Sequence, residues 1–458
     1  MGIAAKTLKF AELGMDAPRR FTRSNVAVLI GATGAMAATR FASNLILARI
    51  LAPRDFGAMF ILYAVLTAFQ LLSETGTAAF MVRDEEATKP VVVNTIRTVM
   101  MIRGVVIGAL VFAFAPAIAG LFGKPELTGA FRVISLAPVI LGASSMRLLL
   151  TTREGRQRIN EGFELSVILL NTALTLVLAI WLENYWALVI AGVTKPLLTV
   201  AGAEIFYRRI PFRPQIDGRT FARLVRFSSY IFLSSVLTLI VTQADRIIVG
   251  SRLTLETAGL YGMAMTMCAI GTTLAQKYSR RVFFPEVARS LRLGTSGDAA
   301  YYGSLKRVRY LMLVLFGGGL TFGETFFDIC FDDRYLQAGT IFSVAVIGPI
   351  VKLFADPAQA FIVASGNTRA GFIRSVINLV HILIFAPTLF YLFGVMGLVW
   401  AVATLDLGAA LFLNWRLVRM GVWRPEPELR SVLAVGAGAA TGLAASGLVN
   451  AALHALGH

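Results

Sequence analysis

The sequence predicts an all-α polytopic membrane protein of about 12–13 transmembrane helices, arranged as two six-helix bundles related by a parallel pseudo-two-fold axis. Three observations predict this fold: an apolar composition, about thirteen apolar segments long enough to cross a bilayer, and basic residues concentrated in alternate gaps between these segments. The chain has 458 residues, of which 57% are hydrophobic, and a mean hydropathy of +0.72. This composition excludes a soluble globular protein.

The apolar segments carry the prediction of the helices. Each is close to the ~20 residues that a helix needs to cross the hydrocarbon core of a bilayer. They span residues 25–50, 56–82, 98–122, 127–150, 163–182, 185–207, 227–250, 257–276, 308–331, 336–365, 370–393, 395–415 and 431–456. The last segment is rich in glycine and alanine, so we expect an accessory helix there and leave open whether it crosses the membrane.

The basic residues predict the orientation. Lys and Arg cluster in alternate gaps, at residues 6–23, 83–97, 147–158, 208–226, 277–309, 369–374 and 416–430. The intervening gaps hold only Arg54, Lys124, Arg252 and Arg334. Because positive charge resists translocation, we expect the rich gaps and the N-terminus to be cytoplasmic, in a multi-pass protein of the bacterial inner membrane. We assign the net charge of +17 to these loops and predict no nucleic-acid partner.

A long basic connector at 208–226 divides the first twelve apolar segments into two sets of six. We expect a cytoplasmic tail at 1–24, a first bundle at 25–209, a connector with an amphipathic helix at 210–226, a second bundle at 227–420, and a connector with the accessory helix at 421–458. Leu51 lies six residues before Gly57 after the first segment, and Leu253 lies six residues before Gly259 after the seventh. Two parallel repeats of this kind predict a transporter with its substrate path between the halves.

Several short segments resemble those of one known family. Residues 40–57 (RFASNLILARILAPRDFG) have the form of the first turn in polysaccharide-export flippases, and 244–250 (ADRIIVG) with 258–261 (AGLY) look like the segment that opens their second half. The FFP element at 283–285 also fits. Over roughly residues 21–420 the chain resembles Wzx-type flippases, in the superfamily that includes multidrug exporters and the lipid II flippase. The resemblance implies two helical bundles, alternating access, and a cargo of oligosaccharide on an undecaprenyl pyrophosphate carrier.

Basic residues inside the apolar segments are the candidates for binding the pyrophosphate. A charged side chain at mid-bilayer costs ~2.5–3.5 kcal/mol on insertion scales, so such residues usually face a polar interior. The candidates are Arg40, Lys195, Arg246, Lys352 and Arg132. Arginines in a low-dielectric cavity can replace the hydration of a pyrophosphate with charge-assisted hydrogen bonds. For Arg132, snorkelling to the membrane interface is the alternative.

Other polar residues in the segments are candidates for a polar cavity or for ion coupling. They are Glu74, Gln70, Asn44, Asp245, Asp356 and Asp406. Asn44 shares a helix face with Arg40, and a polar stripe at helical spacing runs from Thr67 to Thr77. Asp245 and Arg246 point about 100° apart on a helix, so each needs its own partner.

Two acidic positions leave alternatives open. Lys352 and Asp356 lie four residues apart, and they form either a local salt bridge or a cavity-facing pair that exchanges partners. Asp406 is a lone carboxylate in its segment, and such groups bind Na⁺, carry protons or pair with an arginine. His381 shares a face with Asn378 and is interpreted as a structural histidine rather than a switch.

The sequence contains no GxxxxGK[ST] loop, no HExxH and no CxxC motif, and it has three histidines. We therefore predict neither an enzyme nor a direct use of ATP, no metal and no cofactor, with coupling to Na⁺ or H⁺ left open. The predicted function is translocation of undecaprenyl-pyrophosphate-linked repeat units for exopolysaccharide, capsule or O-antigen synthesis. An ion-coupled multidrug exporter of the same superfamily is the alternative. The expected partners are the lipid-linked glycan and membrane lipids, with polysaccharide polymerase or export machinery left open.

Overall fold

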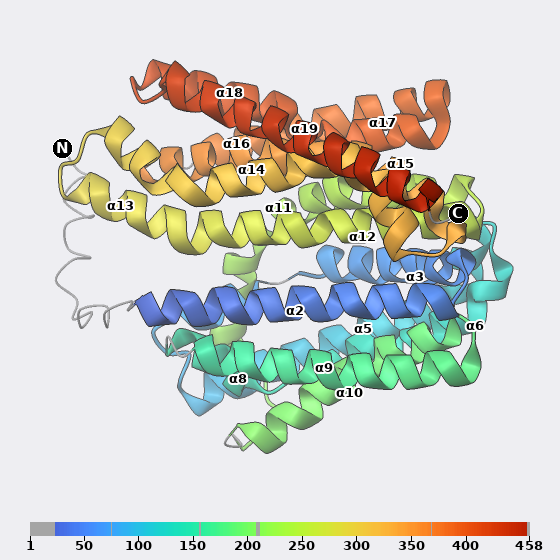
Figure 1. Cartoon of the computed structure of the whole chain (residues 1–458). Helices are drawn as coiled ribbons and strands as arrows, with labels where there is room; N and C mark the ends of the chain where they lie inside the picture. The colour runs from blue at the N-terminus through green and yellow to red at the C-terminus, as the bar shows by residue number, and fades with distance from the viewer. Residues whose placement is uncertain (1–22, 75, 155–156, 208–210, 368, 456–458) are drawn as a thin grey trace.

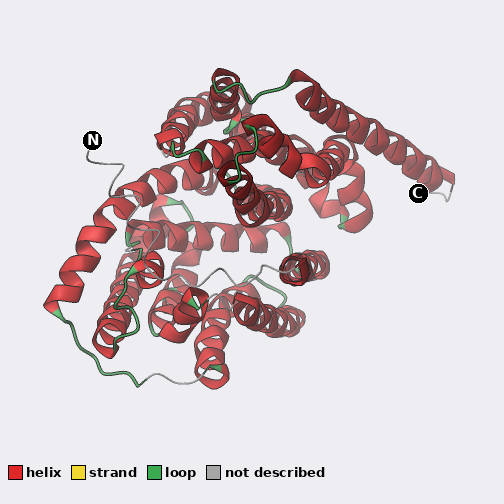
Figure 2. Ribbon diagram, turned by 90° about the vertical axis from the view of Figure 1, so that its left-hand side faces the viewer, coloured by secondary structure: helices red, strands yellow, loops and turns green. Residues whose placement is uncertain are grey.

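The computed structural model describes residues 23–74, 76–154, 157–207, 211–367 and 369–455, so the predicted tail lies outside it up to residue 22. Every regular element in these ranges is a helix (Figure 2). The first half of the chain forms α2 (Arg23–Ile50), α3 (Pro53–Leu72), α4 (Thr77–Arg83), α5 (Pro90–Leu121), α6 (Thr128–Ile134), α7 (Leu136–Gly142), α8 (Met146–Arg153), α9 (Gln157–Leu182) and α10 (Trp186–Phe206). The second half forms α11 (Gly218–Arg252), α12 (Leu255–Tyr278), the π-helical turn η2 (Ser279–Phe283), α13 (Phe284–Arg292), α14 (Gly297–Cys330), α15 (Leu336–Ala345), α16 (Ile347–Ala364), α17 (Arg369–Ala403), α18 (Leu407–Arg419) and α19 (Pro425–Ala455).

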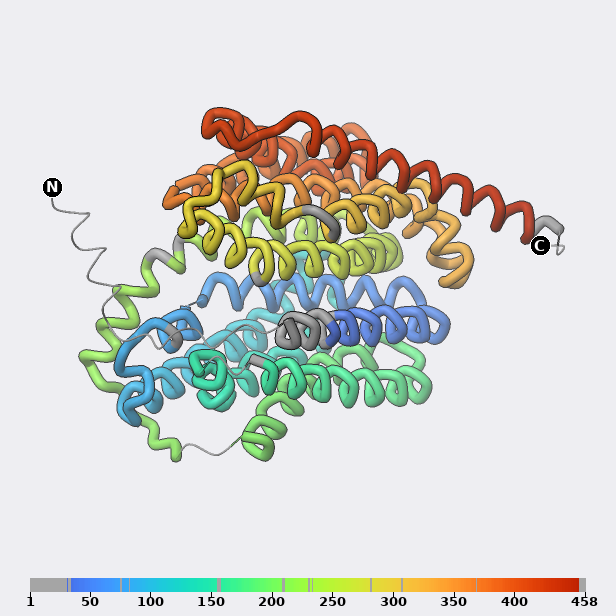
Figure 3. The backbone as a smooth tube through the Cα atoms, turned by 60° about the vertical axis from the view of Figure 1, so that its left-hand side comes forward, coloured from blue at the N-terminus to red at the C-terminus, as the bar shows by residue number. Residues whose placement is uncertain are grey.

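Most helices lie with their axes roughly aligned, and they form two groups, α2–α10 on one side and α12–α19 on the other (Figures 1 and 3). Each group has its own apolar core, built around residues such as Phe131 in the first and Phe327 in the second. The groups meet where α3 packs against α11 and α12. We call the end that holds α8 and α13 the basic end. We call the end that holds α6, α15 and the C-terminus the turn end (Figure 1).

Ten described helices are long and apolar enough to cross a membrane, or eleven when the two limbs of α11, bent by 50°, count as one span. One of the ten, Arg369–Arg419, covers two of the predicted segments, and α2 is not among the ten. All thirteen predicted segments fall on helices of the described chain. Adding α2 and counting the two limbs within Arg369–Arg419 separately would raise eleven spans to the thirteen segments that the sequence predicts.

The two predicted segments within Arg369–Arg419 form a hairpin. Gly394 has φ 60° and ψ −139°, which breaks α17 into two limbs. A Cβ on Gly397 would lie 1.9 Å from the carbonyl oxygen of Leu389, so the backbones touch directly after the turn. Further along, the Nε2 atom of His381 lies 3.0 Å from the carbonyl oxygen of Ala401. The chain therefore reverses at Gly394, and His381 has the structural partner that the sequence favoured.

The structure corrects two predicted segments. The segment at 56–82 is interrupted, because α3 ends at Leu72 and α4 begins at Thr77, after Gly76 with φ 61°. The segment at 127–150 is interrupted between Gly142 and Met146, where Ser145 caps α8. The prediction of one continuous polar stripe from 67 to 77 was therefore wrong, since left-handed backbone at Gly76 turns the chain before the stripe is complete.

The last predicted segment is the long helix α19, which packs along α14 and ends at the opposite end of the molecule from α2's start (Figure 1). A Cβ on Gly438 would lie 2.1 Å from the carbonyl oxygen of Val314, so the two backbones are in contact. At the basic end, Arg309 of α14 pairs with Glu428 of α19 at 2.6 Å, and both side chains are buried. Close glycine contacts and a buried ion pair thus fix this helix to the second group.

Hydrogen bonds hold the connector between the halves against α5. The backbone N–H groups of Arg213, Gln215 and Asp217 donate to the side chains of Asn94, Thr98 and Thr95, at 3.1–3.3 Å. Arg223, in the first turns of α11, pairs with Asp84 and Glu86 beside α4. The start of α11 is therefore held against the first group, and the rest of that helix lies between the groups, in contact with α3 on one side and with α12 and α17 on the other.

Candidate functional site

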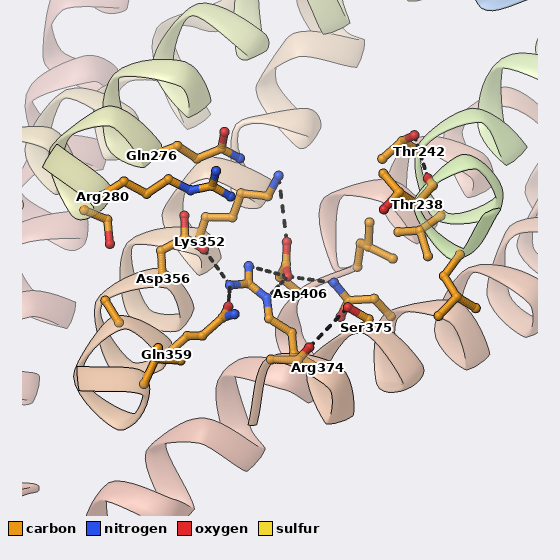
Figure 4. Close-up of a pocket in the computed structure, with 18 of the residues that line it drawn as sticks. Thr238, Thr242, Gln276, Arg280, Lys352, Asp356, Gln359, Arg374, Ser375 and Asp406 are labelled. Atoms are coloured by element: carbon orange, nitrogen blue, oxygen red, sulfur yellow. Dashed lines mark hydrogen bonds and ion pairs between the residues drawn. The ribbon is translucent and has the colours of Figure 1, made fainter. Parts of the chain in front are cut away.

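A charged network lies inside the second group, centred on Arg374 of α17 (Figure 4). The guanidinium donates to Asp406 at 2.7 and 3.0 Å and pairs with Asp356 at 2.7 Å. Asn378 donates to the same Asp406 oxygen at 2.8 Å, and Lys352 lies 3.8 Å from the other. The ion pairs therefore differ from the local Lys352–Asp356 bridge that spacing allowed, and Asp406 is paired with an arginine.

The network lines a cavity of about 510 Å³ between α11, α12, α16 and α17. On the opposite wall stand Gln276 and Arg280, both exposed, together with Thr238 and Thr242 of α11 (Figure 4). Arg280 belongs to the π-helical turn η2, and such turns often re-aim side chains at functional sites. Three cations thus face two carboxylates in this cavity, and Arg280 has no ion-pair partner in the described chain.

The first group places two cations within electrostatic range of each other. Lys195 of α10 interacts electrostatically with Arg40 of α2 and with Glu164 of α9. Arg40 and Lys195 are both exposed, and Arg40 makes no hydrogen bond or ion pair with any residue that the structure describes. Two like charges held near each other without full neutralisation form a natural place for an anion.

A second cavity, of about 480 Å³, lies where the two groups meet. Asn44 of α2 and Arg246 of α11 line it, and the Arg246 guanidinium lies over the ring of Phe60 at 5.4 Å. Asp245 points elsewhere: it is buried and accepts a 2.8 Å hydrogen bond from the hydroxyl of Tyr261. Adjacent Asp245 and Arg246 therefore have separate surroundings, as the helical geometry predicts.

Gln70 and Glu74 lie beside the break after α3, around a smaller cavity of about 170 Å³. Arg103 of α5 donates to the carbonyl oxygen of Gln70 at 2.9 Å and to Ser73 at 3.0 Å, and lies 3.6 Å from a Glu74 oxygen. The second Glu74 oxygen accepts from the N–H of Gly76 at 2.8 Å. The contacts of Arg103 and Glu74 thus stabilise the end of α3 and the turn that follows it.

Arg132 lies apart from these groups. It is exposed on α6, and its guanidinium sits 5.5 Å from the ring of Phe112 on α5. Phe112 is itself 53% exposed. The structure therefore places Arg132 on an outer surface of the first group and brings together Lys352, Asp356 and Asp406, Arg40 with Lys195, and Asn44 with Arg246.

Sequence reasoning missed Arg374, because it was grouped with the basic loop residues. A signal was present: Arg374, Asn378 and His381 are spaced by four and three residues, so they share one helix face. Arg280 was grouped with the basic loop residues as well. No spacing in the sequence predicts the π-helical turn that contains it.

Three comparisons bear on this fold. A family model described as "Polysaccharide biosynthesis protein" matches residues 46–340. The succinoglycan biosynthesis transport protein ExoT of Rhizobium meliloti (strain 1021) is 23% identical over 329 residues, which are 70% of this chain and 64% of the relative. The lipopolysaccharide biosynthesis protein WzxC of Escherichia coli (strain K12) is 19% identical over 71% of this chain and 66% of its own length. The chain thus matches slightly less than two thirds of each relative.

Solved structures share the arrangement of helices. The lipid II flippase MurJ in an inward closed conformation has a TM-score of 0.67 at 10% identity, over 91% of this chain and 92% of that one. An inward-facing multidrug resistance MATE transporter has a TM-score of 0.60 at 13% identity, over 84% and 94% of the two chains. At these identities the likeness concerns the fold, and it confirms the predicted all-α polytopic class.

Proposed function

The chain belongs to the polysaccharide biosynthesis protein family, and from this premise we propose that it translocates oligosaccharide repeat units linked to undecaprenyl pyrophosphate across a bacterial inner membrane. The proposal covers synthesis of an exopolysaccharide, a capsule or an O-antigen. The observation that carries it is a set of cations on the helices that remain without carboxylate partners in the described chain, among them Arg40 of α2 and Arg280, which lines the first cavity.

Arg40 and Lys195 are the residues we assign to the pyrophosphate. The cargo carries several negative oxygens that must leave water to cross. An arginine and a lysine in a membrane interior can replace that water with charge-assisted hydrogen bonds, and ligand binding would relieve their mutual repulsion. The polyprenyl chain stays in lipid, because apolar surface gains nothing from entering a polar cavity.

The network around Arg374 is the candidate for coupling to Na⁺ or H⁺. One oxygen of Asp356 and the amide oxygen of Asn378 are buried without a hydrogen-bond partner in the described chain. Buried acceptors of this kind are costly unless a proton, cation or water reaches them. We therefore propose Asp356 and Asp406 as coupling groups. Glu74, at the turn after α3, is a further candidate.

The test is lipid extraction from a strain that lacks the gene. Accumulation of undecaprenyl-pyrophosphate-linked repeat units, with loss of the surface glycan, is the expected result. Complementation with Arg40→Gln should restore membrane abundance without restoring export. Unchanged lipid and glycan pools would overturn the proposal. Increased sensitivity to cationic drugs in that strain would instead favour the multidrug exporter.

A further inference from the structure

We propose that the cavity of about 480 Å³ where the two groups meet is a saccharide subsite, in which a pyranose ring of the cargo binds Asn44, Tyr63 and Thr67. The inference rests on the proposed function and deepens it, because it separates recognition of the sugar from recognition of the pyrophosphate. The volume falls in the range of ~300–1,000 Å³ that is typical of small-ligand sites.

Three polar side chains of this cavity lack partners. The amide of Asn44 and the hydroxyls of Tyr63 and Thr67 make no hydrogen bond to any residue within the described ranges. All three are at least partly accessible, and Tyr63 is 41% exposed. Other hydroxyls in these helices bond to carbonyl groups one turn back, as Thr266 does to Gly262 at 2.7 Å. The free groups are therefore available to a ligand rich in hydroxyls.

Two aromatic side chains, Phe60 and Tyr63, also line the cavity. Phe60 lies against Gly262, where a Cβ would come within 2.9 Å of its ring, and Arg246 covers the ring at 5.4 Å. Tyr63 lies beside Gly192, where a Cβ would come within 3.2 Å of the phenol oxygen. Two glycines thus make room for two aromatic rings. Aromatic faces suit the apolar C–H face of a pyranose, while the hydroxyls at its rim need polar partners.

The charge of the lining argues for a sugar over other cargo. Arg246 is the only cation among the described lining residues, and no carboxylate is among them. A pyrophosphate would require more positive charge, which Arg40 and Lys195 offer elsewhere. A cationic drug would require an acid. One guanidinium beside several neutral donors and acceptors suits a hydroxylated ring.

The position of the cavity links it to closure of the turn end. Phe56 lines the cavity and packs edge-on against Tyr335 of the second half, with ring centroids 6.0 Å apart. Tyr335 donates to the carbonyl oxygen of Leu51 at 3.0 Å. A sugar in the cavity would therefore contact the same side chains that hold the halves together at that end.

The experiment measures two affinities of the purified full chain in detergent by calorimetry. One probe is the free oligosaccharide repeat unit, released from its carrier by mild acid, and the other is undecaprenyl pyrophosphate without sugar. Tyr63→Leu and Thr67→Val should each weaken oligosaccharide binding about tenfold, because each removes a hydroxyl that would hydrogen-bond the sugar, and should leave binding of the carrier unchanged. Tyr63→Phe should show a smaller loss that reports the hydroxyl alone.

A matched control is Phe114→Leu, which replaces an aromatic ring that is 55% exposed on α5 outside the cavity. It should bind both probes as the wild type does. If the wild type binds the carrier while Tyr63→Leu and Thr67→Val bind oligosaccharide normally, or if no oligosaccharide binds at all, the subsite is refuted and the proposed function stands. If the wild type binds neither probe, the proposed function falls with it.

Discussion

Gly57 of α3 and Gly259 of α12 lie against each other's helix in a reciprocal contact. A Cβ on Gly57 would lie 1.8 Å from the carbonyl oxygen of Leu255, and a Cβ on Gly259 would lie 1.8 Å from that of Pro53. Pro53 and Leu255 each lie four residues before the glycine of their own helix. The weak sequence repeat around these glycines is thus a two-fold contact in space, and only hydrogen side chains allow it.

Replacing either glycine should prevent the turn end from closing. Gly57→Ala or Gly259→Ala forces α3 and α12 apart, and overpacking of this kind typically costs about 1–3 kcal/mol. We expect glycan export to fall at least tenfold while the protein still reaches the membrane. Surface glycan and protein abundance measure the two effects.

Gly120→Ala is the control for this prediction, because a Cβ on Gly120 of α5 would meet nothing within 4 Å. It should export normally. Normal export by Gly57→Ala, with Gly120→Ala equally active, would show that the contact is not needed for transport.

Removing Arg374 should destabilise the second group. Asp406 is buried, so Arg374→Ala leaves it with only the Asn378 amide and the more distant Lys352. Breaking a buried pair in this way typically costs about 3–5 kcal/mol. Thermal unfolding in detergent measures the loss.

Two comparisons sharpen this test of the network. Arg369→Ala, at an exposed position of the same helix, should unfold like the wild type. The double variant Arg374→Ala/Asp406→Ala should lose less than the two single losses combined, because no unpaired carboxylate remains at 406. Additive losses would mean that the pair is not coupled.

The contact between α14 and α19 should depend on Gly438. Gly438→Val places side-chain atoms on the backbone of Val314, so α19 should detach and become sensitive to protease. Gly447→Val changes the same helix where a Cβ would meet nothing within 4 Å, and it should remain resistant. Equal resistance of both variants would refute the claim that this glycine fixes the helix.

The first turn of α11 should depend on pH through Asp217. Its carboxylate accepts from the N–H and the hydroxyl of Thr220, both at 2.8 Å, and these bonds hold the pKa of Asp217 below its ordinary value. A lowered folded pKa means that the cap stabilises the turn above the ordinary aspartate range, and that this contribution is lost as the pH falls through the lowered pKa.

Hydrogen exchange at the amide of Thr220 measures this cap. Asp217→Ala should accelerate exchange at neutral pH and abolish the acid-dependent step, while Asp217→Ser, which retains a capping oxygen, should accelerate it less. An acid-dependent step that persists in Asp217→Ala would assign the titration to another group.

Hydropathy and charge alternation predicted where helices form, because a membrane leaves a chain few alternatives to a helix of about 20 apolar residues. The interruptions at Gly76 and between Gly142 and Met146 were not predicted. The polar stretches at residues 73–77 and 143–145 are short, and the apolar residues on either side let one predicted segment run across each break. The turns themselves depend on backbone conformations that hydropathy does not record.

The site was predicted less completely than the fold. The cost of burying charge singled out Lys352, Asp356 and Asp406, which the structure brings together, but the partner that joins two of them is Arg374. Partner choice depends on how α16 and α17 pack, over distances of tens of residues in the sequence. Tyr63 carried no signal, since an aromatic residue in an apolar segment is indistinguishable from one that faces lipid.

The hairpin at Gly394 has a consequence for biogenesis. Its turn carries no charged residue, and the flanking side chains of Tyr391 and Phe393 are 89% and 66% exposed. Because no polar loop has to be carried through the bilayer, the two limbs can leave the insertion machinery as one unit. The turn at Gly394 would then lie at a membrane interface, where the side chains of Tyr391 and Phe393 suit the headgroup region. A charged residue introduced at this turn should therefore hinder insertion of the hairpin into the membrane, a step that precedes any binding of cargo.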